Sequence, residues 1–291
     1  MAANAASRFD TAPPLPADLL ERAAVELGET PQSREDGLRA LHEYYDAHPQ
    51  ERPHRMDAPY LLMFLRHAKF DTAQARGRLD AMERWLRDCG DEIGDVTKIR
   101  GTDFVELYGQ GFMGVLTSDR RTRDGSCIHL LLPHKMVPLQ DPSLLLRWSV
   151  WVLMRGVHDP YIQVCGQVIV ESVEHYSLFQ ALRFRQVPRE VTQKNLRFAQ
   201  ECMPFRLRGI WVTHMPAWVG VLLAIVRPFL SSKLRPRVRL LGSSPSELAA
   251  LVDLALLPRE LGGSHADAGQ EWFRAQLRAE AEAAEGQGEA E

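Results

Sequence analysis

The sequence predicts an α/β fold in which a helical segment precedes a mostly parallel sheet. Three observations lead to this prediction. Apolar residues recur at helical spacing through the first 90 residues. An Asp124-Gly125 pair between two apolar runs is typical of a β-hairpin. Beyond residue 162, short apolar runs alternate with longer helical patterns, which is the order of parallel strands joined by helical crossovers.

The N-terminal helices are predicted from their boundary residues. Pro16 and Gly28 flank a first helix, whose apolar residues repeat every three or four positions. Another is centred near residues 38–45. Asp57 is the expected N-cap of a third, and Asp71 with Gln74 makes a capping pair for a fourth.

The second half of the chain alternates between strand and helix patterns. A helix opening at Ser244 follows the last strand, and the acidic tail is expected to be partly disordered, above all in its last ten residues. The predicted elements are a hairpin over 111–132, a helix over 143–154, strands over 162–170, 206–213 and 237–241, and helices over 176–184, 189–203 and 216–233.

Composition limits the class of protein. The chain has 291 residues, of which 45% are hydrophobic and 25% charged, so about two domains with sizeable cores are expected. A net charge of −3 argues against a nucleic-acid-binding protein. The four cysteines have no CxxC spacing, which argues against a zinc site or a disulfide scaffold. No signal peptide is recognised, and His214 and Pro216 interrupt the longest uncharged stretch.

No catalytic motif is found. The chain lacks GxSxG, a phosphate-binding Gly-rich loop and HExxH. His129 and His214 each lie among apolar residues, so either is a candidate base, but neither has an obvious nucleophile. A core or pocket histidine is the favoured interpretation. We therefore predict no catalytic residues, metal ligands or cofactor, and keep a hydrolase as an alternative.

Basic residues are segregated in one segment. From Cys202 to Ser246 there is no acidic residue, although these 45 positions hold seven arginines and lysines. Such a cluster suits phosphate groups of lipid headgroups or an anionic membrane surface. A solvated basic surface near a helix C-terminus is the alternative.

The helix expected at 217–229, AWVGVLLAIVRPF, is apolar on all sides. A helix of this kind is either a central core helix or a lid over an apolar cavity. Pro216, Gly220 and Pro228 give its ends the character of hinges.

Over residues 31–263 the chain resembles the CRAL-TRIO lipid-binding family, in the branch of the alpha-tocopherol transfer protein and the cellular retinaldehyde-binding protein. The stretches that carry this resemblance are DAPYLLMFLRHAKFD (57–71), GFMGVLTSDRRTRDGSCIHLL (111–131), IQVCGQVIVESVEHYSL (162–178), PFRLRGIWVTHMPAWVGVLLAIVRPFLSSKLRPRVRLLG (204–242) and LLPRELGG (256–263). Ala68 departs from the pattern, because the family has a second arginine there. Pro236 disfavours a helix at the preceding residue.

The resemblance implies an N-terminal helical bundle (1–95) packed on an α/β lipid-binding domain (96–265), with an acidic tail (266–291). A mostly parallel sheet would floor an apolar cavity, and the helix at 216–234 would act as its gate. The family's phosphoinositide-binding positions match Arg206, Arg208, Lys233 and Arg237. Arg206 and Arg208 are expected to leave their strand on one face, since they are two residues apart.

The expected function is that of a cytoplasmic carrier. It would bind a tocopherol-like or retinoid-like lipid and exchange it at membranes that contain phosphoinositides such as phosphatidylinositol bisphosphate, on endosomes or elsewhere. A lipid-responsive adaptor or sensor is the alternative. The expected cavity-lining residues are Ser149, Val150, Leu153, Val168, Val170, Ile210, Val212, Val219, Leu222, Leu223 and Val226. Ser149 is expected to hydrogen-bond a ligand hydroxyl.

Overall fold

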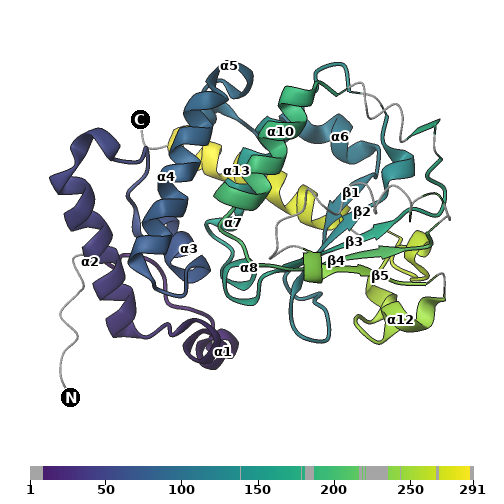
Figure 1. Cartoon of the computed structure of the whole chain (residues 1–291), viewed down its shortest axis with the longest axis horizontal. Coiled ribbons are helices and arrows are strands. Elements are labelled where there is room, and N and C mark those ends of the chain that lie inside the picture. The colour runs from purple at the N-terminus through teal and green to yellow at the C-terminus, as the bar shows by residue number, and fades with distance from the viewer. Residues whose placement is uncertain are drawn as a thin grey trace. The chain divides into compact units, whose positions relative to one another are not determined.

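The computed structural model (Figure 1) divides the chain into two compact units. The first unit comprises Met1–Gly94, Leu145–Cys165 and Thr192–Arg206; the second comprises Asp95–Leu144, Gly166–Val191 and Leu207–Glu291. The structure describes residues 9–137, 139–177, 179–180, 187–215, 218, 220, 235–242, 244–266 and 269–288. Two segments in the middle of the sequence, 145–165 and 192–206, are thus grouped with the N-terminal helices, a division that differs from a single boundary at residue 95.

The first unit is helical, as its apolar spacing predicts. Its elements are α1 (Ala17–Leu27), α2 (Pro31–Ala47), η1 (Pro49–Glu51), α3 (Ala58–His67), α4 (Thr72–Asp88), α5 (Gly90–Ile93), most of α7 (Leu144–Gly156), α8 (Pro160–Cys165), the end of α10 (Arg189–Arg197) and the π-helical turn η6 (Phe198–Cys202). The α3 helix is its centre, because residues 60–65 are all fully buried. Helices α2 and α4 both pack against α3.

Capping residues set the ends of these helices. Gly28 ends α1 in the left-handed region, at φ 72°, which a residue with a Cβ atom rarely adopts. Asp57 accepts a hydrogen bond from the Tyr60 amide at the start of α3, and Asp71 accepts one from the Gln74 amide at the start of α4. These three boundaries confirm the sequence prediction.

A buried ion-pair network ties the connection between α1 and α2 to α2, α3 and α8. The carboxylate of Glu29 accepts hydrogen bonds from Arg34 (3.0 Å) and from Arg66 (2.7 and 2.9 Å). Arg66 also donates to Gln163 Oε1 at 2.5 Å, and Arg34 donates to Asp10. Because every charge has an opposite partner, the network offsets the cost of removing these groups from water.

The second unit is built on a five-stranded sheet in the order β1-β2-β3-β4-β5. Strands β1 and β2 form the predicted antiparallel hairpin, and β2, β3, β4 and β5 are parallel. The strands are β1 (Met113–Val115), β2 (Cys127–Leu131), β3 (Gln167–Ser172), β4 (Leu207–Thr213) and β5 (Val238–Leu240). The helical elements are η2 (Val96–Lys98), η3 (Gly101–Phe104), α6 (Val105–Gly109), η4 (Pro133–Lys135), η8 (Arg235–Arg237), α12 (Pro245–Ala249), η9 (Leu254–Leu256), η10 (Arg259–Leu261) and α13 (Gln270–Gly288).

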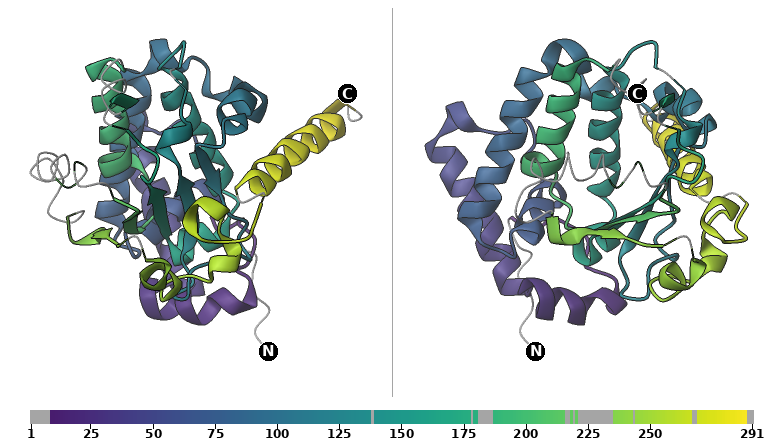
Figure 2. Two further views of the ribbon diagram at one scale, coloured as in Figure 1. Left: turned by 90° about the vertical axis from the view of Figure 1, so that its right-hand side faces the viewer. Right: turned by 45° about the vertical axis from the view of Figure 1, so that its right-hand side comes forward.

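Two predicted elements differ from the structure. The strand expected over 162–170 starts only at Gln167, because Asp159 and Pro160 begin the short helix α8 and Gly166, at φ 75°, ends it. The tail expected to be partly disordered forms the helix α13, which extends away from the sheet in Figure 2. Its start is fixed by Phe273, whose ring stacks on Tyr108 at 3.9 Å.

Candidate functional site

The two faces of the sheet differ in how they are covered. One face, here called the core face, carries Ile128, Leu130, Val168, Val170 and Trp211, all of them buried. They pack against apolar residues of the C-terminal segment, including Leu248, Val252, Leu257 and Leu261. This face is a closed hydrophobic core.

That core corrects part of the predicted cavity lining. Val168 pairs in register with Gly209, and Val170 pairs with Trp211. Along β4, Ile210 and Val212 alternate with Gly209 and Trp211. Their side chains therefore point to the other side of the sheet. Val168 and Val170 are thus core residues, and they cannot share a face with Ile210 and Val212.

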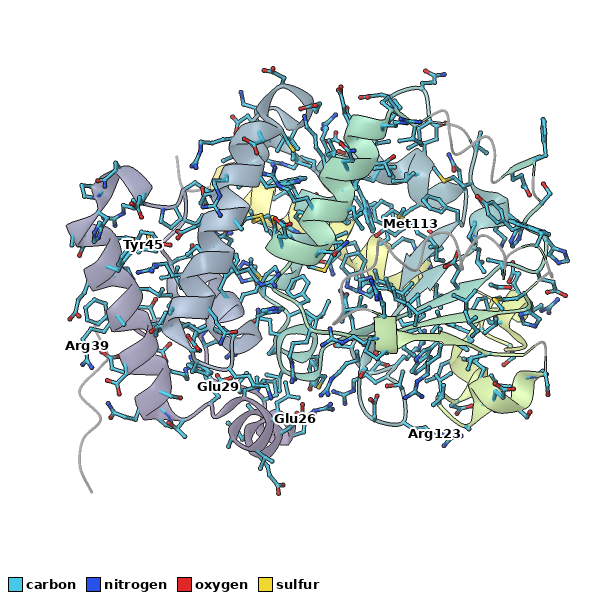
Figure 3. All side chains as sticks on the ribbon, in the orientation of Figure 1. Glu26, Glu29, Arg39, Tyr45, Met113 and Arg123 are labelled. Carbon is cyan, nitrogen blue, oxygen red and sulfur yellow. The ribbon has the colours of Figure 1, made fainter. Side chains whose placement is uncertain are left out.

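The other side of the sheet, here called the opposite face, holds two rows of side chains. The registers of the five strands align Val115, His129, Ile169, Ile210 and Val238 in one row, and Met113, Leu131, Glu171, Val212 and Leu240 in the next. Met113 is labelled on β1 in Figure 3. Eight of the ten side chains are apolar. Six of these ten side chains are only half-buried, and they lie on β2, β3, β4 and β5: His129, Leu131, Ile169, Glu171, Ile210 and Val238. Every core-face residue named above is buried.

His129 is one of the two ionisable groups in these rows. Burial lowers the pKa of His129 to about 4, so the imidazole is neutral near pH 7. Its Nε2 atom is shielded from solvent and has no hydrogen-bond partner among the residues that the structure describes. A buried polar atom in this condition costs free energy unless something else supplies a partner.

Glu171 is the other ionisable group. Burial raises the pKa of Glu171 to about 7, with no compensating interaction within the described part of the chain. Its charge in turn contributes to raising the pKa of Tyr176, after the effect of burial. Glu171 and Tyr176 therefore lie close together, at the end of β3.

An apolar rim closes this end of the opposite face. Val173 and Val212 form a small cluster with Ile210, Tyr176, Met215 and Trp218. The rings of Tyr176 and Trp218 have their centroids 5.9 Å apart. Trp218 belongs to the predicted gate segment, so at least this residue of the segment packs beside the opposite face.

Arg206, a predicted headgroup ligand, is held by other groups of the first unit. Its guanidinium donates to the carboxylate of Glu26 at 3.1 Å and to the carbonyl oxygen of Val164. Only 14% of its side chain is exposed. Glu26 also pairs with Arg22 at 2.9 Å, on α1, the helix where Figure 3 labels Glu26.

Arg208 lies at an irregular position of β4. Gln167 pairs with Leu207 and the next residue, Val168, pairs with Gly209, so Arg208 is the extra residue of a β-bulge. Arg206 precedes the strand, which starts at Leu207. The expectation that Arg206 and Arg208 leave one strand on the same face is therefore wrong, because strand alternation does not continue through the bulge.

The other predicted site residues are distributed as follows. Arg237 is exposed in the 3₁₀ turn η8, which agrees with the effect expected of Pro236. Lys233, Val219, Leu222, Leu223 and Val226 lie outside the described residues. In α7, Val150 and Leu153 are fully buried in the first unit. Ser149 donates to the Leu145 carbonyl at 2.9 Å, and its hydroxyl lies 3.4 Å from Asn195 Oδ1.

Sequence reasoning did not select Ile169 and Glu171 for the pocket. The apolar run around β3 contains no alternation that separates one face from the other, apart from Glu171 itself. Side-chain alternation is the signal that identifies them. Ile210 and Val212 are among the predicted lining residues, Ile169 and Glu171 pair with them, and paired residues lie on the same face of the sheet.

Chemistry at this site is limited. Ser172 Oγ lies 3.5 Å from His214 Nδ1, but Ser172 is completely buried and the same nitrogen lies 3.0 Å from Thr213 Oγ1.

No group of His, Cys, Asp and Glu suited to a metal ion occurs among the described residues. Within that part of the chain, no helix is long and apolar enough to cross a bilayer.

Comparison with known proteins is consistent with this architecture. The family model described as the CRAL/TRIO domain matches residues 112–263. Clavesin-1 of Rattus norvegicus is 26% identical over 248 residues, which cover 85% of this chain and 68% of the relative. The alpha-tocopherol transfer protein-like protein of Homo sapiens is 26% identical over 249 residues, covering 85% of this chain and 70% of the relative.

A solved structure supports the fold. The crystal structure of Sfh5 superposes with a TM-score of 0.54 and covers 85% of this chain and 92% of its own. The sequence identity is 11%, so this likeness concerns the fold alone.

Proposed function

The chain belongs to the CRAL/TRIO domain family, and from this premise we propose that it carries a hydrophobic lipid, tocopherol-like or retinoid-like, on the opposite face of the sheet. The observation that supports the proposal is the pair of rows described above. Eight apolar side chains line them, and central ones such as Leu131, Ile169 and Ile210 are only half-buried. Burying such surface under a lipid is favourable by about 25 cal/mol per Å².

The relatives support the same class of function. One of them is named for its likeness to the alpha-tocopherol transfer protein, and the names describe no catalytic activity. We propose binding rather than conversion for this chain, since the two hydroxyls beside His214, those of Thr213 and Ser172, are both buried and shielded from any substrate. The gate segment 216–234 would cover the lipid and move aside for exchange.

Exchange is proposed to occur at membranes that contain phosphoinositides, to which the chain would attach peripherally. Arg237 is exposed, and Arg208 lies near Asp124. Burial acts to raise the pKa of Asp124, but hydrogen bonds within its turn and the charge of Arg208 hold it below its ordinary value. Together with Lys233, these cations would hold a bisphosphorylated headgroup. Arg206 is proposed as a further phosphate contact when its ion pair with Glu26 opens.

Lipid transfer between vesicles tests the proposal. Donor vesicles carry fluorescent tocopherol, and acceptor vesicles contain either phosphatidylinositol bisphosphate or only phosphatidylcholine. We expect faster transfer to the first acceptor, and we expect Arg208→Glu with Arg237→Glu to abolish the difference without weakening tocopherol binding in solution. Arg278→Glu, an exposed charge on α13, is the matched control.

The outcomes separate the alternatives. Loss of both tocopherol binding and vesicle binding in the double variant would contradict two separate sites. Stable tocopherol binding without transfer to any acceptor would instead favour the lipid-responsive adaptor.

A further inference from the structure

Two polar groups lie in the middle of the otherwise apolar rows of the opposite face. His129 is aligned with Ile169, and Glu171 is aligned with Leu131, on the neighbouring parallel strand. The two positions are diagonal neighbours, about 8 Å apart between Cα atoms from the strand spacing and two residues of rise. Side chains from such positions can reach one small group placed between them.

Both groups are available to a ligand. The His129 Nε2 atom is buried without a hydrogen-bond partner among the described residues. No hydrogen bond or ion pair lowers the pKa of Glu171 within the same part of the chain. A core residue in this position would normally find a protein partner, as the buried arginines of the first unit do.

We propose that His129 and Glu171 form the polar end of the lipid site and select a neutral lipid with one hydroxyl or carbonyl oxygen. This inference rests on the proposed carrier function and narrows its ligand class. A hydroxyl donates and accepts one hydrogen bond each, which suits a neutral imidazole beside a carboxyl group.

Charge excludes the other lipid classes from this position. The remaining members of the two rows are aliphatic side chains and Met113, so an ionised phosphate or carboxylate placed there would be buried without a cation from these rows. Ionised Glu171 would also repel it. A phospholipid headgroup or a fatty-acid carboxylate is therefore not expected between His129 and Glu171.

Three probes that differ only at one oxygen test this inference. They are α-tocopherol, its methyl ether and its phosphate ester, each titrated into the full chain with tryptophan fluorescence as readout. The phenol is expected to bind about five- to tenfold more tightly than the ether, the value of one net hydrogen bond. The phosphate ester is expected to bind at least tenfold more weakly than the ether.

A substitution of His129 tests whether this residue supplies the selectivity. His129→Leu is expected to reduce the phenol-to-ether ratio to about 1 while the affinity for the ether stays within twofold, which also reports that the variant is folded. Ile169→Val, beside His129 in the same row, is the matched control and should weaken both probes equally.

The outcomes distinguish this inference from the proposed function. Equal binding of phenol and ether by the unaltered chain overturns the polar selection and leaves the carrier function intact. Preference for the phosphate ester overturns it too. Failure of all three probes to bind contradicts both the neutral ligand class and a tocopherol-like cargo.

Discussion

Replacing Glu171 by glutamine should stabilise the protein at alkaline pH but not at acidic pH. Burial raises the pKa of this carboxyl group to about 7 from an ordinary value of 4.5. Between these two values the folded state keeps a proton that the unfolded state has lost, so stability falls as the pH rises through this interval. Above pH 7 the full penalty applies, about 3 kcal/mol for a difference of about 2.5 pKa units.

Glutamine has nearly the same shape and no charge, so it removes this penalty. We expect the gain in unfolding free energy of Glu171→Gln over the unaltered chain to be about 3 kcal/mol larger at pH 8 than at pH 4.5. Urea unfolding followed by tryptophan fluorescence at the two pH values measures this difference. The contribution of His129 is common to both proteins and cancels.

A control residue lies three positions away. Glu174 is exposed on the turn after β3, and Glu174→Gln should change the unfolding free energy by less than about 0.5 kcal/mol at either pH. A gain for Glu171→Gln that is the same at pH 4.5 and pH 8 would refute the reasoning. It would mean that burial does not disfavour the ionised form of the Glu171 carboxyl group in the folded protein.

Three further perturbations follow from the geometry. Glu29→Gln leaves Arg66 buried without its carboxylate and should cost about 3–5 kcal/mol of unfolding free energy; a loss under about 1 kcal/mol in urea unfolding would contradict the network. Glu26→Gln releases Arg206 and should increase sedimentation with vesicles containing phosphatidylinositol bisphosphate about threefold, whereas unchanged sedimentation would count against Arg206 as a headgroup ligand. Gly269→Ala places a Cβ atom 2.5 Å from the Cα atom of Gly114 in β1, at a φ of 87° that alanine rarely adopts. The substitution should loosen the start of α13, so limited proteolysis should cut the helix faster. An unchanged cleavage rate would argue against tight docking of that helix.

Local signals in the sequence were sufficient for the helices of the first unit. Asp57 and Asp71 are N-caps because their carboxylates reach amides within one turn, and that geometry depends on neighbouring residues alone. The β1–β2 hairpin is local in the same sense, since Asp124 and Gly125 set its turn.

Long-range registers explain what the sequence did not determine. Val168 and Ile169 are equally apolar, and only pairing with β4 decides which of them faces the core. The bulge at Arg208 likewise arises from pairing with β3, so spacing along one strand gave the wrong side-chain direction. The second half of the α13 helix is acidic, with Glu280, Glu282 and Glu285, and the stacking of Phe273 on Tyr108 that fixes the start of the helix joins residues far apart in sequence.

Identification of the bound lipid tests the central claim most directly. The full chain would be purified from a lipid-rich eukaryotic extract, and its organic extract would be analysed by mass spectrometry against protein concentration. We predict one neutral, hydroxyl- or carbonyl-bearing lipid at close to one molecule per chain. A protein that stays empty after exposure to tocopherol, retinal and phosphatidylinositol would contradict the carrier function.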